Sequence, residues 1–232
     1  MTARQALVVR GGWDGHQPVQ TTDEFIPHLE ANGFSVRIEE ESTKVYADAE
    51  YMAGVDLVVQ CMTMTTIEKD ELAGLMTAVE NGTGMAGWHG GIADSYRNSS
   101  DYLHFIGGQF ACHPGKHPDE LTGEQPDNYV PYRVNMLPAA AEHPITQGIG
   151  DFDLVTEQYW VLSDDYLDVL ATTTQAVREW DQWNRPVTSP AIWTRQWGKG
   201  RLFVCTPGHN VDVVRDTNVK TIIERGLLWA AR

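Results

Sequence analysis

Apolar strand patterns that alternate with helix patterns constrain the fold more than any other feature of this chain. Residues 5–10, 34–38, 55–60 and 85–88 read as strands. The segments VDLVVQ at 55–60 and MAGW at 85–88 are largely apolar runs, which is typical of strands buried on both faces. Their order predicts an α/β fold in which helices cover both sides of a mostly parallel sheet.

Two helices are predicted between these strands. The first contains Phe25, and Pro27 within it should kink or shorten it, because proline cannot donate a helical hydrogen bond. The second has Thr65 or Thr66 as its N-cap and ends at residues 81–82, an Asn-Gly pair. Its apolar residues recur at helical spacing, namely Leu72, Leu75, Met76 and Val79.

The second half of the chain has strand patterns without long helices between them. These segments are 130–136, 151–160, 167–173, 189–195 and 200–206. They predict an antiparallel extension of the sheet, one more central strand at 202–205, and a C-terminal helix that packs on the sheet. Because no Pro/Ser-rich linker or repeat divides the 232 residues, a single domain over residues 1–232 is expected.

Composition argues against several classes of function. The formal net charge is −15 and no basic cluster offsets it, so nucleic-acid and membrane partners are not expected. The N-terminus lacks a signal-peptide pattern, and no segment approaches the roughly 20 apolar residues of a membrane span, so a cytoplasmic protein is expected. Cys61, Cys112 and Cys205 are far apart and lack CxxC spacing, which favours reduced thiols.

Residues 84–118 are the most informative stretch for function, because they hold four of the eight histidines among many glycines. The apolar run 85–88 leads directly into His89-Gly90-Gly91. Glycines allow a sharp turn and leave room for a ligand close to the backbone, which favours a site. A glycine-rich surface loop with solvated histidines is the alternative.

Parallel sheets bind ligands outside the carboxyl ends of their strands. This rule selects the loops at 13–16, 62–66, 89–97 and 207–212. It brings His16, His89 and His209 to one rim of the sheet. A structural histidine is the alternative at each position, but three histidines from distant segments favour a functional site.

Two glycine motifs surround His89. GTGMAG at 82–87 matches GxGxxG, but it ends a helix and enters a strand, the reverse of a dinucleotide fingerprint, so no nucleotide cofactor is expected. GWHGG at 87–91 has the glycine frame of a nucleophile elbow, with His89 at its centre. Histidine there suits acid/base catalysis, ligand hydrogen bonding or metal coordination rather than acyl transfer.

Further candidates follow in the chain. His113 and His117 are four residues apart, but the prolines beside them disfavour a helical metal pair, so His113 alone is the better ligand candidate. Glu157 lies among apolar residues; if buried, it needs a histidine cluster or a cation as its partner, and a strand edge facing water is the alternative. Three tryptophans near these residues suit sugar binding, namely Trp13, Trp88 and Trp160. The alternative is that they are core residues, as most tryptophans are.

The sequence resembles the ThuA-like family, named for a trehalose-utilisation protein and similar in fold to class I glutamine amidotransferases. The segments that carry the resemblance are GGWDGH (11–16), GWHGGIADSYR (87–97), FIGGQFACHP (105–114), HPITQGI (143–149), EQYW (157–160) and GKGRLFVCTPGHN (198–210). The resemblance implies a three-layer, flavodoxin-like α/β sandwich and a role in carbohydrate catabolism, often beside sugar dehydrogenases that make keto-sugars. It does not imply glutamine hydrolysis, since His89 stands where amidotransferases have cysteine.

Residues and resemblance together predict one site. The expected ligands of a divalent cation such as zinc are His16, His113 and His209, and the expected acid/base residues are His89 and Glu157. The expected substrate contacts are Trp13, Asp14, Trp88, Asp94, Arg97 and Trp160. The expected reaction is isomerisation, elimination or hydrolysis of a keto-sugar.

Two other functions are kept as alternatives. One is a sugar-binding module without catalysis, and the other is a cysteine-dependent hydrolase that uses Cys61 or Cys112. The expected partner is a small molecule. For the keto-sugar enzyme and for the sugar-binding module, this small molecule is a carbohydrate. Whether the protein forms a homo-oligomer is left open.

Overall fold

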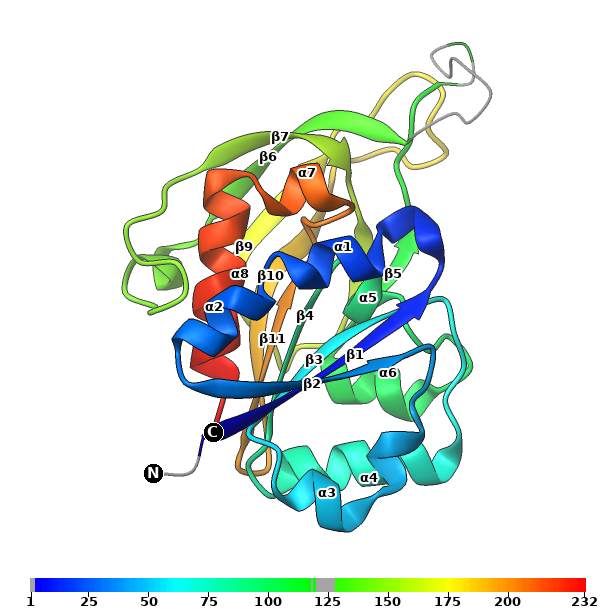
Figure 1. Cartoon of the computed structure of the whole chain (residues 1–232). Coiled ribbons are helices and arrows are strands. Elements are labelled where there is room, and N and C mark those ends of the chain that lie inside the picture. The colour runs from blue at the N-terminus through cyan, green and yellow to red at the C-terminus, as the bar shows by residue number, and fades with distance from the viewer. Residues whose placement is uncertain (1–2, 118, 120–127) are drawn as a thin grey trace.

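A nine-stranded sheet forms the centre of the computed structural model, which describes residues 3–117, 119 and 128–232. Its strands are β1 (Arg4–Gly12), β2 (Phe34–Glu40), β3 (Leu57–Thr63), β4 (Gly84–Trp88), β6 (Tyr129–Met136), β7 (Phe152–Glu157), β9 (Asp168–Gln175), β10 (Val187–Trp197) and β11 (Gly200–Cys205). Their order is β2-β1-β3-β4-β11-β10-β9-β6-β7 (Figure 1). A separate antiparallel pair joins β5 (Gly108–Cys112) to β8 (Trp160–Ser163).

Strand direction divides the large sheet into two parts. β2, β1, β3, β4 and β11 run parallel to one another. β10, β9, β6 and β7 extend the sheet through antiparallel pairs. β11 lies between β4 and β10, the central place predicted for residues 202–205. The predicted α/β fold with an antiparallel extension is therefore confirmed.

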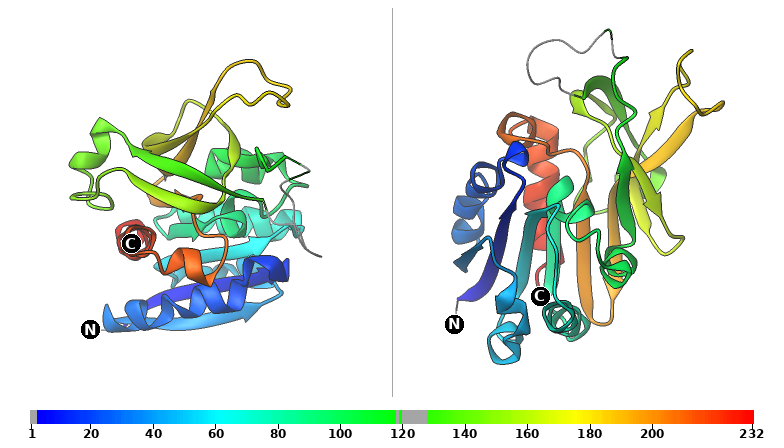
Figure 2. Two further views of the ribbon diagram at one scale, coloured as in Figure 1. Left: turned by 90° about the horizontal axis from the view of Figure 1, so that it is seen from above. Right: turned by 90° about the vertical axis from the view of Figure 1, so that its right-hand side faces the viewer.

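Helices cover both faces of this sheet (Figure 2). The longer ones are α1 (Pro18–Asp23), α2 (Ile26–Ala31), α3 (Ala49–Ala53), α4 (Lys69–Glu80), α6 (Ser100–Ile106) and α8 (Thr217–Ala230). The shorter ones are η1 (Asp14–His16), η2 (Lys44–Ala47), α5 (Gly90–Ala93), η4 (Pro138–Ala141) and α7 (Val211–Val214). α1, α2 and α8 pack over one face, whereas α3, α4 and α6 pack over the other.

Each face of the sheet has its own hydrophobic core. Val8 of β1 packs in one core with Phe25, whereas Leu7 and Val58 pack in the other core with Leu75 of α4. Successive residues of a strand point to opposite faces, so neighbouring residues serve different cores. This explains why the central strands are apolar at successive positions. Among the described residues, no helix combines the length and the apolar character that a membrane span requires.

The helix boundaries agree with prediction at Pro27 and differ from it at the start of α4. The helix around Phe25 is shortened, because α1 ends at Asp23 and α2 begins at Ile26, and Pro27 lies in the first turn of α2, where its missing N–H interrupts no helical hydrogen bond. Neither Thr65 nor Thr66 caps α4, whose N-cap is Glu68. The backbone N–H of Thr65 instead donates to the carbonyl of Ser95, which ties this segment to the loop after α5.

The segment predicted as one strand at 151–160 forms two strands in different sheets. β7 ends at Glu157 and β8 begins at Trp160. β5, which pairs with β8, was not predicted, because the glycines at 107–108 obscure its short pattern. β6 and β7 lie above the carboxyl ends of the central strands (Figure 1), so the end of β7 reaches the rim where the parallel strands end.

The packing of α8 on the sheet leads to a stability prediction. A Cβ atom on Gly226 of α8 would lie 2.2 Å from the ring of Phe203 in β11, which is fully buried. We expect Gly226→Ala to lower the free energy of unfolding by about 1–3 kcal/mol despite the better helix propensity of alanine, because the crowding outweighs it. Urea denaturation measures this change.

The matched control for this substitution is Gly150→Ala, where an added Cβ would meet nothing within 4 Å. Its unfolding free energy should change by less than about 0.5 kcal/mol. Equal midpoints for both variants and the wild type would contradict the close packing of α8 against β11.

Candidate functional site

Three histidines and one glutamate from four distant segments meet at the rim. His16 ends η1 after β1, His89 follows β4, His209 lies in the loop after β11, and Glu157 is the last residue of β7. All four are buried, and one potential ligand atom from each lies within 4.8 Å of those of the others. The convergence of His16, His89 and His209 at the carboxyl ends of the strands agrees with the rule used in the sequence analysis.

One oxygen of Glu157 is the centre of this histidine–glutamate cluster. The ring nitrogens around its Oε2 are His209 Nδ1 at 2.8 Å, His89 Nε2 at 3.1 Å, His113 Nε2 at 3.4 Å and His16 Nε2 at 3.8 Å. Glu157 is buried, so the alternative of a strand edge facing water does not hold. His113 follows β5, and its side chain is the most exposed of the four rings, at 20%.

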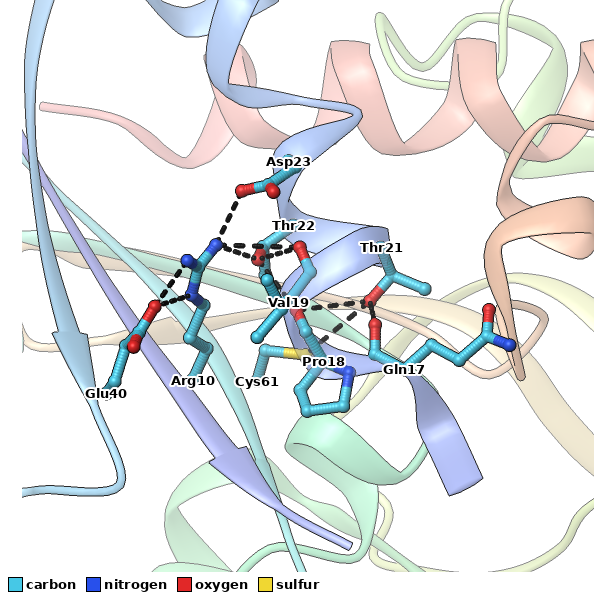
Figure 3. A network of polar contacts seen from close by, with 9 residues as sticks. All are labelled: Arg10, Gln17, Pro18, Val19, Thr21, Thr22, Asp23, Glu40 and Cys61. Atoms are coloured by element: carbon cyan, nitrogen blue, oxygen red, sulfur yellow. Dashed lines mark hydrogen bonds and ion pairs between the residues drawn. The ribbon is translucent and has the colours of Figure 1, made fainter. Parts of the chain in front are cut away.

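A buried arginine anchors the end of β1 (Figure 3). Arg10 donates hydrogen bonds to Glu40 of β2 and to Thr22 and Asp23 of α1. Burial alone would lower the pKa of Arg10, but these carboxylates outweigh it and raise the pKa, so the guanidinium stays charged. The end of β1 is thereby fixed to both neighbouring elements.

The turn after β1 requires glycine. Gly12 has φ +84°, and a Cβ there would lie 2.0 Å from the carbonyl oxygen of Thr63. The close approach lets the N–H of Trp13 donate to the same carbonyl at 3.2 Å. His16 follows in η1, and its Nδ1 lies 3.0 Å from the hydroxyl of Thr63. The end of β3 therefore positions the first histidine.

His89 occupies the strained turn of an elbow between β4 and α5. Its backbone has φ 48° and ψ −142°, a combination that a residue with a side chain rarely adopts. Its N–H donates to the carbonyl of Cys205 at 2.7 Å, and α5 begins at the next residue. A Cβ on Gly90 would lie 2.4 Å from the ring of His16, and one on Gly91 would lie 2.8 Å from Cys61. Because Gly90 and Gly91 have no side chain, the elbow can lie directly against the ring of His16 and against Cys61.

Backbone carbonyls fix the orientation of two of the rings. His89 Nδ1 lies 2.7 Å from the carbonyl oxygen of Thr206, and His113 Nδ1 lies 3.3 Å from that of Gln158. A carbonyl oxygen only accepts hydrogen bonds, so Nδ1 carries the proton in both rings. In each neutral ring the lone pair is then on Nε2, the atom that faces Glu157.

Burial opposes protonation of these rings. Burial lowers the pKa of His89 to about 3, and it also lowers the pKa of His16 and of His113. Burial alone would raise the pKa of Glu157, but its interactions with His16 and His209 outweigh burial and hold that pKa well below its usual range. The centre therefore contains an ionised carboxylate, and the rings of His16, His89 and His113 are neutral.

This donor set fits a divalent cation. Lone pairs that face a buried carboxylate repel it unless a positive charge lies between them, and neutral imidazole with carboxylate is a usual ligand set for zinc. A histidine that ligates a metal usually donates its second ring N–H to a carbonyl or a carboxylate, as His89 does to Thr206. The residues with suitable geometry are His16, His89, Glu157 and His209.

Comparison with known proteins identifies the family of the chain. The family model ThuA, described as trehalose utilisation, matches residues 5–230. The chain belongs to the ThuA family. No curated protein matches the sequence.

Solved structures share the fold of this ThuA-family chain. A ThuA-like protein from Bacteroides uniformis ATCC 8492 is 17% identical, with a TM-score of 0.71 over 98% of this chain and 91% of its own. One from Parabacteroides merdae ATCC 43184 is 15% identical, with a TM-score of 0.69 over 98% and 90%. A cytoplasmic protein from Salmonella typhimurium LT2 is 14% identical, with a TM-score of 0.62 over 98% and 100%. At these identities the similarity shows the fold alone.

The predicted substrate contacts of the ThuA-family chain lie in different surroundings. Trp13 is 48% exposed, and its ring meets that of His16 edge-on at 4.7 Å, beside the cluster. Asp14 is exposed in η1. Asp94 is buried and forms an ion pair with Arg97, with Nε and Oδ1 2.5 Å apart. Both belong to the loop after the elbow.

Two of the predicted substrate contacts, Trp88 and Trp160, pack against other aromatic rings. Trp88 is buried in the core and packs against Phe25, the N-cap of α2, so a sugar contact does not fit it. Trp160 packs edge-on against Trp183 of the β9–β10 loop. His117 pairs with Asp119 and also lies outside the histidine–glutamate cluster.

Several residues of the site were missed in the sequence analysis. The ring of Tyr159 lies 4.2 Å from that of His89, and the ring of Tyr129 lies 5.2 Å from that of His209. Tyr159 stands inside the EQYW segment and Thr206 inside GKGRLFVCTPGHN, so the family segments carried a signal for both. Tyr129 carried none, since its place depends on its pairing with Glu157 across β6 and β7.

The strain at the elbow predicts a difference between two variants that both lack the imidazole. Glycine adopts the φ of His89 freely, whereas alanine does not. We expect His89→Gly to be more stable than His89→Ala by about 1 kcal/mol or more in urea denaturation. If the alanine variant were equally stable or more stable, the elbow would not be strained.

The burial of the cysteines predicts which of them a thiol reagent will modify, and this tests the alternative of a cysteine-dependent hydrolase. Burial raises the pKa of Cys61 to about 12 and raises that of Cys205 further, whereas Cys112 is only half-buried. Iodoacetamide at pH 8 should therefore modify native protein at Cys112 and leave Cys61 and Cys205 unmodified, as peptide mass spectrometry will show. Rapid modification of Cys61 in the folded protein would contradict this and revive the hydrolase alternative.

Proposed function

We propose that this ThuA-family chain is an enzyme of carbohydrate catabolism that holds a divalent cation at His16, His89, Glu157 and His209 and converts a keto-sugar. The observation that carries the proposal is the convergence of these ring nitrogens on one buried carboxylate oxygen. His89 and Glu157 thereby join the proposed ligands, whereas the sequence alone suggested them as acid/base residues. A bound divalent cation would polarise a carbonyl or hydroxyl oxygen of the sugar.

His113, which the sequence suggested as a ligand of the cation, is instead the proposed acid/base residue. Its Nε2 faces Glu157 at 3.4 Å, yet its side chain is more exposed than those of His16, His89 and His209. Its Nδ1 is held by the carbonyl of Gln158, so Nε2 is the atom free to take up and release a proton. The proposal places the substrate beside this ring, whose side chain is 20% exposed.

A sugar is favoured as the substrate for two reasons. The family model is described as trehalose utilisation, which concerns a carbohydrate. The exposed ring of Trp13 beside His16 offers an apolar face next to polar groups, the combination that suits a sugar ring. A cytoplasmic location is proposed with it, because one structural relative is described as a cytoplasmic protein.

Metal content is the first test. Protein purified without a His-tag should contain about one equivalent of a divalent metal by mass spectrometry, since four ligands form one site. His16→Ala and His209→Ala should each weaken metal binding by about tenfold or more, because each removes a ligand. His104→Ala, an exposed histidine of α6, should leave it unchanged. Substoichiometric metal in the wild type, with turnover insensitive to chelator, would remove the cation from the proposal.

Turnover distinguishes an enzyme from a sugar-binding module. His113→Gln should lower turnover of a 3-keto-glycoside by about 10²- to 10⁴-fold while metal content is kept, because it removes the proton carrier but none of the four proposed ligands. His104→Gln is the matched control and should retain wild-type turnover. Binding of the keto-glycoside by the wild type without any turnover would favour the module.

A further inference from the structure

Five polar side chains lie together in the core beside α5, and the proposed chemistry uses none of them. They are joined by hydrogen bonds, with Gln60 of β3 at the centre. None of them is more than 1% exposed. We call them the Gln60 network, which comprises Gln60, Tyr46 of η2, Tyr102 of α6, and Ser95 and Tyr96 of the loop between α5 and α6.

The Gln60 network places an amide where an apolar side chain would be expected. Gln60 lies in β3, a strand that is buried along its whole length. Its Oε1 accepts a hydrogen bond from Tyr46 at 2.6 Å, and its Nε2 donates to Tyr96 at 2.9 Å and to Ser95 at 3.3 Å. An amide is costly to bury unless it is hydrogen-bonded, whereas a leucine would need no partner. A buried polar network whose members are all hydrogen-bonded makes the elements around it rigid and specifies one arrangement of them.

The Gln60 network ends on the carbonyl groups of α5. The hydroxyl of Ser95 donates to the carbonyl of Gly91 at 2.8 Å, and the hydroxyl of Tyr102 donates to that of Ile92 at 2.9 Å. Helix α5 has only four residues, so its last carbonyls find no partner within the helix. Gln60 in turn donates to Ser95, which links these hydroxyls to β3. The network therefore holds α5 in place against the central sheet.

The same helix carries the strained elbow at its other end. His89 is the N-cap of α5, and its carbonyl accepts a hydrogen bond from the N–H of Ala93 at 2.9 Å. A strained backbone such as that of His89 persists only where its surroundings enforce it. A shift of α5 would allow the elbow to relax, and Nε2 of His89 would then leave its place 3.1 Å from Oε2 of Glu157.

We propose that the Gln60 network positions the imidazole of His89, and that Gln60, Ser95 and Tyr102 are positioning residues of the site. They act through α5 rather than through contact with the cation. The place of the His89 ring depends on the network whether or not a ligand is bound. The effect of the network on cation binding rests on the proposed function, in which His89 is a ligand.

Two double variants of the full-length protein separate positioning from stability. Ser95→Ala/Tyr102→Phe removes the two hydroxyls that donate to α5. The matched control is Thr83→Val/Thr146→Val, which removes two hydroxyls that are equally buried and donate at 2.8 Å to carbonyls outside α5. Both variants should lower the urea midpoint, because each removes two buried hydrogen bonds.

Two measurements then report on His89. The first is the NMR signal of its ring Nδ1–H in metal-free protein, which is hydrogen-bonded to the carbonyl of Thr206 and is assigned by its absence from His89→Gly. The second is the affinity for zinc, measured by competition with a chelator. In Ser95→Ala/Tyr102→Phe the ring signal should shift or broaden, and zinc should bind about tenfold more weakly, as when other residues that orient a metal ligand are replaced. In the control variant both should match the wild type.

The proposal is overturned if Ser95→Ala/Tyr102→Phe keeps the ring signal or the zinc affinity of the wild type, or if the control variant changes them as much. A second variant, Tyr46→Phe/Gln60→Leu/Tyr96→Phe, replaces the amide and two of its partners with apolar groups, so it should fold even if the first does not. Its ring signal should change in the same way, and an unchanged signal would also contradict the proposal. If the wild type binds no zinc, the proposed function fails, and the ring signal alone decides whether the network positions His89.

Discussion

The site depends on one buried carboxylate. Glu157 at the end of β7 lies within 4 Å of a ring nitrogen from each of four histidines, which reach it from the loops after β1, β4, β5 and β11. An isolated buried carboxylate would cost several kcal/mol, so the loops around it must supply compensating charge or hydrogen bonds. The arrangement of β6 and β7 above the central strands is what brings the carboxylate there.

Tightly packed backbone segments surround Glu157 and its histidines. Gly12, Gly90 and Gly91 leave no room for a Cβ, and His89 itself has a strained backbone. Strain of this kind persists only where the surrounding structure enforces it, and here β3, β4 and β11 enforce it through parallel pairing. The parallel half of the sheet thus positions His16, His89 and His209, while the antiparallel half contributes the glutamate.

The sequence predicted the parts of the site that follow from strand order. His16, His89 and His209 follow parallel strands, and the carboxyl ends of such strands meet at one rim. Trp88 directly precedes His89 and faces the core, as alternation along a strand would have indicated. The burial of Glu157 was left open, because it depends on where the segment 151–160 divides and on the path of β6. Those features result from contacts between distant antiparallel strands, which local patterns do not encode.

The central claim is that a cation belongs between the histidines and Glu157. An anomalous difference map, from crystals of protein purified without a His-tag, tests it most directly. The account predicts a peak about 2.0–2.2 Å from a carboxylate oxygen of Glu157 and from ring nitrogens of His16, His89 and His209. A map with no peak at that position, in crystals soaked with zinc, would contradict it, and so would a metal bound only elsewhere.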